Sequence, residues 1–197
     1  ADGNLSPVIE KEILDTLLMD NQRAANIIRS LRSIFSDEGV NVSRVDFADL
    51  VTRVLDIAKP EIASKNIQIA LRLEPNLLAS VNSGEVQQVL LNLINNAVQA
   101  LTASQVINKT LTIEGCTTSG GIQISVADNG NGIPRDAQSR LFELLSGSKT
   151  SGMGLGLWLC KHIVTRHGGS IRYEDNPGGG ARFVFEFPHD SIHSKRV

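Results

Sequence analysis

Apolar residues recur at helical spacing over the first forty residues of the chain. Between Val8 and Phe35 there is no Gly or Pro, and Leu17, Ala24 and Leu31 stand seven residues apart. Heptad spacing of this kind favours a long helix in a helical bundle. A helix folded onto its own domain is the alternative. The polar segment "SDEGVNVS" then predicts a linker.

After the linker, helical and strand patterns alternate. Asp46 and Asp49 open a predicted helix over about 46–64, which Pro60 kinks or ends. The segment 66–73 alternates apolar residues with polar or small ones, a pattern typical of a half-buried strand. Asn82, followed three residues later by Glu85, has the spacing of a helix cap and begins the next helix.

Strand patterns dominate the second half of the chain. "TLTIEGC" and "GIQISVAD" flank "TTSGG" as a β-hairpin does. Helices are predicted near 134–142 and over about 154–167, and "GSIRYED" and "ARFVFEF" predict the last strands. This order predicts an α+β fold, a two-layer sandwich. The expected domains are residues 1–40, 41–189 and a tail, 190–197.

The helix containing "QQVLLNLINNAVQAL" (87–101) has amides on its polar face. With about 100° per residue, Gln88, Asn92, Asn96 and Gln99 fall within roughly 80° of arc. Asn is a poor helix former, so the column suggests a task beyond solvation. Amide oxygens suit a magnesium ion that keeps waters and takes its other ligands from substrate phosphates. Amides that cap loops or face another subunit are the alternative.

Two glycine-containing segments accompany this column. "VADNGNGIP" ends a strand in Asp128, which could accept a hydrogen bond from an exocyclic amine, although such turns are common on surfaces. "SGMGLGL" (151–157) precedes a helix, where freed backbone N–H groups suit an anion such as phosphate. A plain flexible loop is the alternative. The spacing matches neither the P-loop nor the Rossmann motif.

Composition narrows the class of protein. A net charge of −2 with 20% charged residues gives no case for nucleic acid or an anionic membrane as the main partner. No apolar run approaches the roughly 18 residues of a membrane span. Cys116 and Cys160 lack metal-ligand spacing, and we expect both to be reduced and buried.

Together, these motifs resemble the ATP-binding catalytic domain of sensor histidine kinases, in the superfamily shared with gyrase B, Hsp90 and MutL. "NLINNAVQA" resembles the asparagine box, "DNGNGIP" the first glycine box, and "GMGLGLWLCKHIVTRHGG" the second. "LFELLSGSKTSGMGLGL" resembles the phenylalanine box with a short ATP lid, and "NPGGGARFVFEFP" the closing glycine box and strand. The resemblance covers about 46 to 188 and looks closest to the rhizobial oxygen and dicarboxylate sensors. Residues 5–36 resemble the second helix of the dimerisation and phosphotransfer hairpin.

The resemblance implies a Bergerat-type ATP-binding fold that uses ATP and Mg²⁺. Asp128 would accept the adenine amino group, Asn96 with Asn92 would ligate magnesium, Lys149 would reach the terminal phosphates and Phe142 would anchor the lid. The implied catalytic residues are Asn92, Asn96 and Lys149. The implied nucleotide-binding residues are Asn92, Asn96, Gln99, Asp128, Gly130, Gly132, Ile133, Phe142, Lys149, Thr150, Gly152, Met153, Gly154, Leu155, Gly156 and Leu157.

The chain departs from the family pattern in the lid, in the last box and at the phosphoacceptor. Leu144, Leu145, Gly147 and Ser148 replace the Pro, Phe and two Thr usual in the subgroup, and Ala181 stands where Thr is common. The family's acceptor is a His followed by an acid on the hairpin's first helix. Of His162, His167, His189 and His193, only His189 precedes an acid, and it lies in the tail. We therefore expect that the first hairpin helix is absent.

The implied function is γ-phosphoryl transfer from ATP to a His, for relay to a response regulator receiver domain. A homodimer is expected for the full-length kinase, which would be cytoplasmic or the cytoplasmic portion of a membrane-bound sensor. No nucleic acid and no direct membrane contact are expected, and this chain alone should not autophosphorylate. An ATPase that activates water is one alternative, but Asn92 is an amide where a general base would be needed. A dimerisation module with a vestigial ATP site is another.

Overall fold

The chain divides into two units, Ala1–Gly39 and Val40–Val197. The computed structural model describes Ile13 and residues 41–144 and 155–189. Apart from Ile13, the predicted N-terminal helix lies outside the described residues, as does the tail 190–197.

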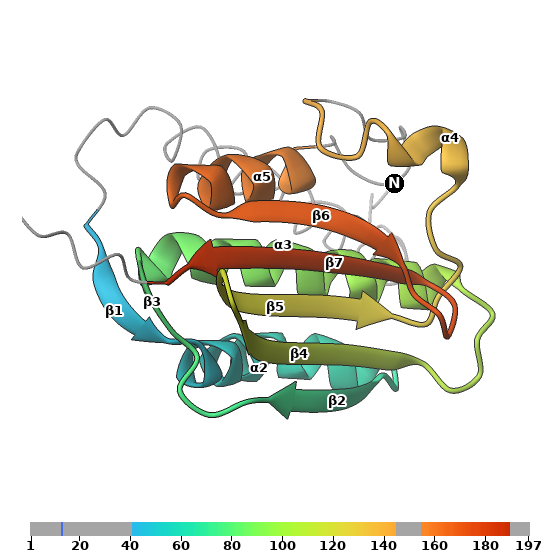
Figure 1. Ribbon diagram of the computed structural model, residues 1–197. Helices are drawn as coiled ribbons and strands as arrows, with labels where there is room; N and C mark the ends of the chain where they lie inside the picture. The colour runs from blue at the N-terminus through green and yellow to red at the C-terminus, as the bar shows by residue number, and fades with distance from the viewer. Residues whose placement is uncertain (1–12, 14–40, 145–154, 190–197) are drawn as a thin grey trace, which may run out of the picture. The chain divides into compact units, whose positions relative to one another are not determined.

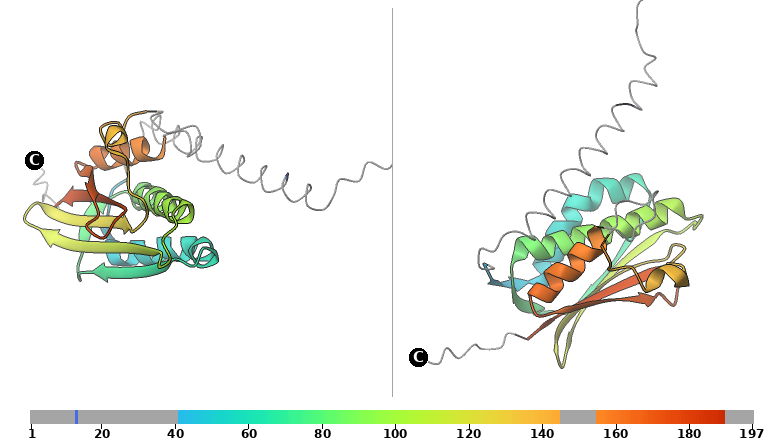
Figure 2. Two further views of the ribbon diagram at one scale, coloured as in Figure 1. Left: turned by 90° about the vertical axis from the view of Figure 1, so that its right-hand side faces the viewer. Right: turned by 90° about the horizontal axis from the view of Figure 1, so that it is seen from above.

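A mixed sheet forms one layer of the described domain and helices form the other (Figures 1 and 2). The strands lie in the order β2 (Gln68–Leu73), β4 (Thr110–Thr118), β5 (Gly121–Asp128), β7 (Ala181–Pro188) and β6 (Ser170–Asp175). Neighbouring strands are antiparallel except β2 and β4, which are parallel. The helices α2 (Phe47–Ser64), α3 (Ser83–Ala103) and α5 (Gly156–Arg166) cover one face of the sheet (Figure 2). This confirms the predicted two-layer α+β sandwich.

Helix α2 begins as its sequence predicts. Asp46 is the N-cap, and its Oδ1 accepts a hydrogen bond from the Ala48 N–H at 2.8 Å. The helix passes through Pro60 and ends at Ser64. Its buried face packs into the core through Phe47, Leu50, Val51, Val54, Ala58 and Ile62.

Helix α3 is the central helix of the layer and contacts α2, α5, β4 and β5. Asn82 caps it, because the Asn82 Oδ1 accepts the Glu85 N–H at 3.1 Å. The Glu85 carboxylate bonds to α5 rather than back to the cap, so only half of a capping box forms. The buried positions of α3 are Val86, Val89, Leu90, Leu93, Ile94, Ala97, Val98 and Leu101.

Two strands are present that the sequence pattern did not predict. β1 (Ser43–Asp46) and β3 (Leu78–Val81) pair antiparallel in a small second sheet. Each has four residues, too few for a clear alternation of apolar and polar positions.

The predicted half-burial of the strand at 66–73 is wrong for two of its apolar residues. Ile69 is 39% exposed and Leu71 44% exposed. Among the described strands, β2 lies at the end of the order and pairs with β4 alone, so its side chains have strand neighbours on one flank.

The helix predicted near 134–142 is shorter in the structure. α4 covers only Arg135–Gln138, and tight turns follow, in which the Arg140 and Glu143 N–H groups bond to carbonyls three residues earlier. The side-chain amide of Gln138 donates a hydrogen bond to the Ile133 carbonyl at 2.9 Å, which connects α4 to the preceding turn.

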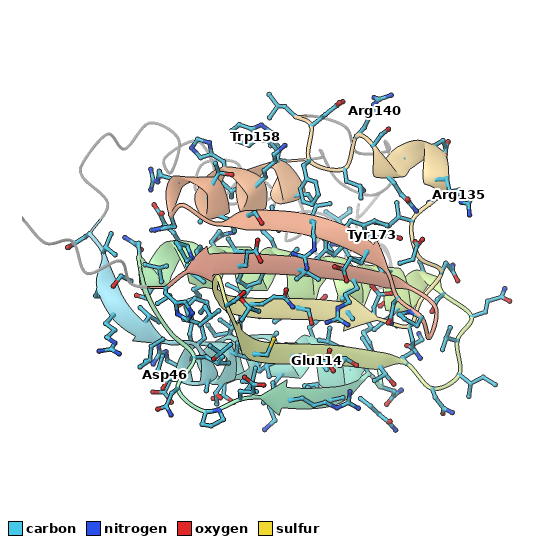
Figure 3. The ribbon with its side chains drawn as sticks, in the orientation of Figure 1. Asp46, Glu114, Arg135, Arg140, Trp158 and Tyr173 are labelled. Atoms are coloured by element: carbon cyan, nitrogen blue, oxygen red, sulfur yellow. The ribbon has the colours of Figure 1, made fainter. Side chains whose placement is uncertain are left out.

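The helix-free face of the sheet carries a ladder of charged side chains, among them Glu114 (Figure 3). Arg72 and Arg182 both pair with Glu114, at 2.9 Å and 3.3 Å.

The two cysteines differ in burial. Cys116, on the same strand as Glu114, is only half-buried, so its predicted burial is wrong, whereas Cys160 on α5 is buried as predicted.

Candidate functional site

Asp128 is the last residue of β5, a strand flanked by β4 and β7, and this central position buries it to 4% exposure. Its Oδ1 accepts the Gly130 N–H at 2.8 Å and the Ala181 N–H at 3.4 Å. Burial raises the pKa of Asp128 above its ordinary value, and the two backbone hydrogen bonds act in the opposite direction. With Oδ1 held by backbone donors, Oδ2 is left to accept a hydrogen bond from a ligand.

The loop between β6 and β7 packs directly on this carboxylate. Gly180 has a φ of +86°, and a Cβ there would stand 2.6 Å from Asp128 Oδ1. Gly132, with a φ of +70°, lies against the Gly180 carbonyl. Asn176 Nδ2 donates to the Asp128 carbonyl at 2.8 Å. The first glycine turn and the closing loop therefore form one unit.

Asn176 and Gly180 were not singled out as individual site residues from the sequence. The segment "NPGGG" is part of the predicted closing glycine box, but no single residue in it was assigned a role. Nothing in that segment indicates which strand end it contacts, because the contact joins residues 48 positions apart.

Asn129 holds the same turn from the other side. Its Oδ1 accepts the Thr110 N–H and its Nδ2 donates to the Asn108 carbonyl, both at 2.8 Å. Gly130 lies near α3, since a Cβ on it would stand 3.4 Å from the Ala100 carbonyl oxygen. The turn is thus fixed between β4 and the C-terminal half of α3.

The amide column forms on α3. Gln88, Asn92 and Asn96 are half-buried, and Gln99 is exposed. Gln88 Nε2 donates to Asn92 Oδ1 at 3.3 Å. Within the described ranges, the Asn96 amide has no hydrogen-bond partner, so it is available to a ligand.

Helix α5 begins beside this column. Asn92 Nδ2 donates to the Gly156 carbonyl at 3.5 Å. The N-cap residue of α5 is Leu155, whose side chain cannot accept a hydrogen bond. The N–H groups of the first turn therefore receive no side-chain acceptor from the N-cap residue. Uncapped amides at a helix N-terminus favour an anion. Leu157 packs half-buried against the core.

The two halves of the site follow α3. One half is the N-terminus of α5, where Gly156 contacts Asn92, and the other is the Asp128 turn, where Gly130 lies next to Ala100. Asn92 and Ala100 are about 12 Å apart along the axis of α3. An elongated ligand with an amine at one end and an anion at the other would fit this arrangement.

Two further predicted residues lie beyond the Asp128 turn. Ile133 is half-buried against the core. The Phe142 ring meets Phe183 edge to face, with centroids 6.3 Å apart and an angle of 89°. Lys149, Thr150, Gly152, Met153 and Gly154 lie outside the described residues.

The donor set suits a metal that keeps much of its water. In the part of the chain that the structure describes, no group of three or more His, Cys, Asp or Glu side chains could hold a metal ion. The amides of Asn92 and Asn96 offer neutral oxygens, which fit magnesium shared with phosphates.

Among the residues that the structure describes, no helix combines the length and the hydropathy that crossing a membrane requires.

Comparison with known proteins agrees with this geometry. The family model described as "Histidine kinase-, DNA gyrase B-, and HSP90-like ATPase" matches residues 82–191. The sensor protein FixL of Bradyrhizobium diazoefficiens is 32% identical over 186 residues, covering 93% of this chain and 36% of FixL. The catalytic domain of histidine kinase ThkA is 27% identical, with a TM-score of 0.68, covering 75% of this chain and 97% of that domain.

Full-length ShkA, solved in complex with AMPPNP, is also 27% identical, with a TM-score of 0.73 over 95% of this chain and 40% of ShkA. The chain spans less than half the length of the curated sensor proteins that it matches, from 20% to 45%. The predicted resemblance to the ATP-binding domain of sensor histidine kinases is confirmed, and the chain belongs to the histidine kinase-, DNA gyrase B- and HSP90-like ATPase family, in the branch of the sensor histidine kinases.

Proposed function

We propose that this chain binds Mg·ATP as the catalytic part of a bacterial sensor histidine kinase. In the intact kinase it would position the γ-phosphoryl group for attack by a His that lies outside the site described here. The phosphoryl group would then pass to a response regulator receiver domain. The full-length kinase would be a homodimer, with this part in the cytoplasm.

The observation that carries the proposal is the placement of three motifs along α3. Asp128 lies at one end, ready to accept the adenine amine through Oδ2. The N-terminus of α5 lies at the other end, beside Asn92, with backbone N–H groups for phosphate. Asn96 lies between them, one turn after Asn92. AMPPNP bound to the related ShkA supports this choice of ligand.

In this proposal the protein acts mainly by positioning and by compensating charge. Asn92 and Asn96 would hold magnesium, which neutralises charge on the triphosphate when bound. Asp128 would orient the base, and the glycine-bounded turn would let the ring approach the backbone. Lys149, outside the described residues, would reach the terminal phosphates.

The structure disfavours an ATPase that hydrolyses ATP with water, because α3 offers no available acidic residue near the proposed metal site. Such an enzyme needs a carboxylate base near the metal. Glu85 is the only acidic residue of α3, and its carboxylate is occupied by Arg166 and His167. It also lies about two turns from Asn92. A low rate of steady-state phosphate release would agree with the kinase assignment.

The proposal is tested by calorimetric titration of AMPPNP with and without magnesium. Wild type should bind, and Asp128→Asn should weaken binding with or without the metal, because it replaces the acceptor of the adenine amine. Asn96→Asp should change binding chiefly when magnesium is present. Gln123→Glu, an amide-to-acid change on the opposite face of the sheet, is the matched control. A folded wild type without affinity for the nucleotide would overturn the proposal in favour of a vestigial dimerisation module.

A further inference from the structure

Helices α3 and α5 run antiparallel to each other and are connected along their length. Side-chain hydrogen bonds join them at three levels, which pair Glu85 with Arg166 and His167, Val89 with Cys160, and Asn92 with Gly156. The last level is at the phosphate-binding end of the proposed site. The first is at the opposite end of α5.

The Glu85 level is the strongest of the three. Both carboxylate oxygens are used: Oε1 accepts from Arg166 Nη2, and Oε2 lies 2.8 Å from His167 Nε2. The side chains of Glu85 and His167 are 16% and 2% exposed, so water screens these contacts little. By contrast, the thiol of Cys160 lies 3.8 Å from the Val89 carbonyl and the Asn92 amide lies 3.5 Å from the Gly156 carbonyl.

The surroundings of His167 fix its ring. It is the C-cap residue of α5, and its imidazole packs edge to face on Phe187 with centroids 6.1 Å apart. Burial, together with the charge of Arg166, lowers the pKa of His167. Because a carboxylate can only accept, Nε2 of His167 is the donor in its contact with Glu85.

We propose that Glu85 is a positioning residue that sets the axial register of α5 on α3 and so aligns the first turn of α5 with Asn92 and Asn96; this rests on the proposed function. α5 has 11 residues and is about 16 Å long, so anchoring its C-terminal end determines where its N-terminus lies. A slip of one turn would move that end by about 5.4 Å and separate Gly156 from Asn92.

The pairing of Glu85 also explains why its predicted capping role is not fulfilled. Asn82 already satisfies the Glu85 N–H, and the carboxylate is directed to another helix 81 residues further along the chain. A residue that served only to cap α3 would have no effect on nucleotide binding beyond stability.

The test compares two ligands that use different parts of the site. Adenosine needs only the Asp128 end, whereas Mg·AMPPNP also needs the α5 N-terminus and the amides. In NMR titrations, Glu85→Leu should weaken Mg·AMPPNP about tenfold and change adenosine affinity by less than about twofold. Glu85→Gln should restore most of the Mg·AMPPNP affinity, because its amide oxygen still accepts from Arg166 or His167.

A destabilised control separates register from stability. Val54→Ala removes fully buried volume from α2, away from α5, and should lower the melting temperature without changing the ratio of the two affinities. If Glu85→Leu does not fold, Glu85→Asp keeps the charge on a shorter side chain and should still weaken Mg·AMPPNP relative to adenosine.

The outcomes distinguish the two proposals. Wild type that fails to bind Mg·AMPPNP would overturn the proposed function itself. Wild-type binding with an unchanged affinity ratio in the folded Glu85 variants would overturn the positioning role and leave the proposed function standing. Equal weakening of both ligands would also overturn the positioning role.

Discussion

The backbone of Gly180 lies so close to Asp128 that a Cβ at position 180 would stand 2.1 Å from the Asp128 carbonyl oxygen. The turn after β5 and the loop between β6 and β7 thus meet without space for a side chain. Asn176 adds a hydrogen bond to the same carbonyl. The carboxylate proposed to recognise adenine is therefore held by a loop that follows β6, as well as by its own turn.

Gly180→Ala should destabilise the protein and displace Asp128. The positive φ alone costs about 1–3 kcal/mol for a residue with a Cβ, and the backbone clash adds to it. Urea denaturation measures the loss, and calorimetry should show weaker nucleotide binding. Gly178→Ala is the control, because nothing lies within 4 Å of its Cβ position. Equal stability of the two variants would contradict this contact.

Asp128→Asn should leave stability unchanged or raise it near neutral pH. Burial raises the pKa of Asp128 above 3.8, so the folded chain binds the proton more tightly than the unfolded chain. Stability from this group therefore falls as pH rises from 3.8 through the raised folded value. Asn removes the buried charge while its Oδ1 can still accept from Gly130 and Ala181. Thermal melts from about pH 4 to about pH 7.5 should show the variant's advantage growing with pH.

Adenosine affinity should respond in the opposite sense to the same substitution. Asp128→Asn places an amide donor where the adenine amine needs an acceptor, so binding should weaken although the fold is intact. In wild type, affinity should fall on acidification through the raised pKa of Asp128. A wild-type affinity that does not change over that range would contradict a role for the ionised carboxylate.

Asn82→Ala should lower the free energy of unfolding by about 1 kcal/mol, because it removes the side chain that caps α3. Asn82→Asp keeps the acceptor and should retain most of the stability. Nucleotide affinity should stay near that of wild type in both, since the contact between Glu85 and α5 is unaffected. Chemical denaturation and calorimetry check the two parts. A selective loss of Mg·AMPPNP affinity in Asn82→Ala would show that the cap also controls the site.

The two cysteines should differ in reactivity. Cys160 is fully buried, and burial raises its pKa to about 12, so its thiol should resist iodoacetamide at about pH 8. Cys116 is half-buried on the helix-free face and should be modified first. Peptide mapping by mass spectrometry, with and without denaturant, gives the order. Early modification of Cys160 in the folded protein would indicate that α5 opens from α3.

Local patterns predicted the elements whose own segment carries a long periodic run, a turn signal or a helix cap. The hairpin of β4 and β5 followed from two alternating runs around "TTSGG", and Asn82 correctly marked the start of α3. The exposure of Ile69 and Leu71 could not be predicted from the sequence. Alternation shows which residues lie on the same face of a strand, but not whether a helix covers that face. β1 and β3 escaped prediction because each pairs with a distant four-residue segment.

By itself, the sequence determined the fold class, the amide column and the identity of Asp128, since periodicity, helix caps and glycine spacing are properties of short segments. Only the tertiary structure decided which segments meet. It placed Gly180 and Asn176 on Asp128, Gly156 beside Asn92, and the Glu85 carboxylate on α5 instead of on its own helix cap. These contacts join residues 48 to 82 positions apart, and they form because the sheet and the buried faces of α3 and α5 bring those segments together.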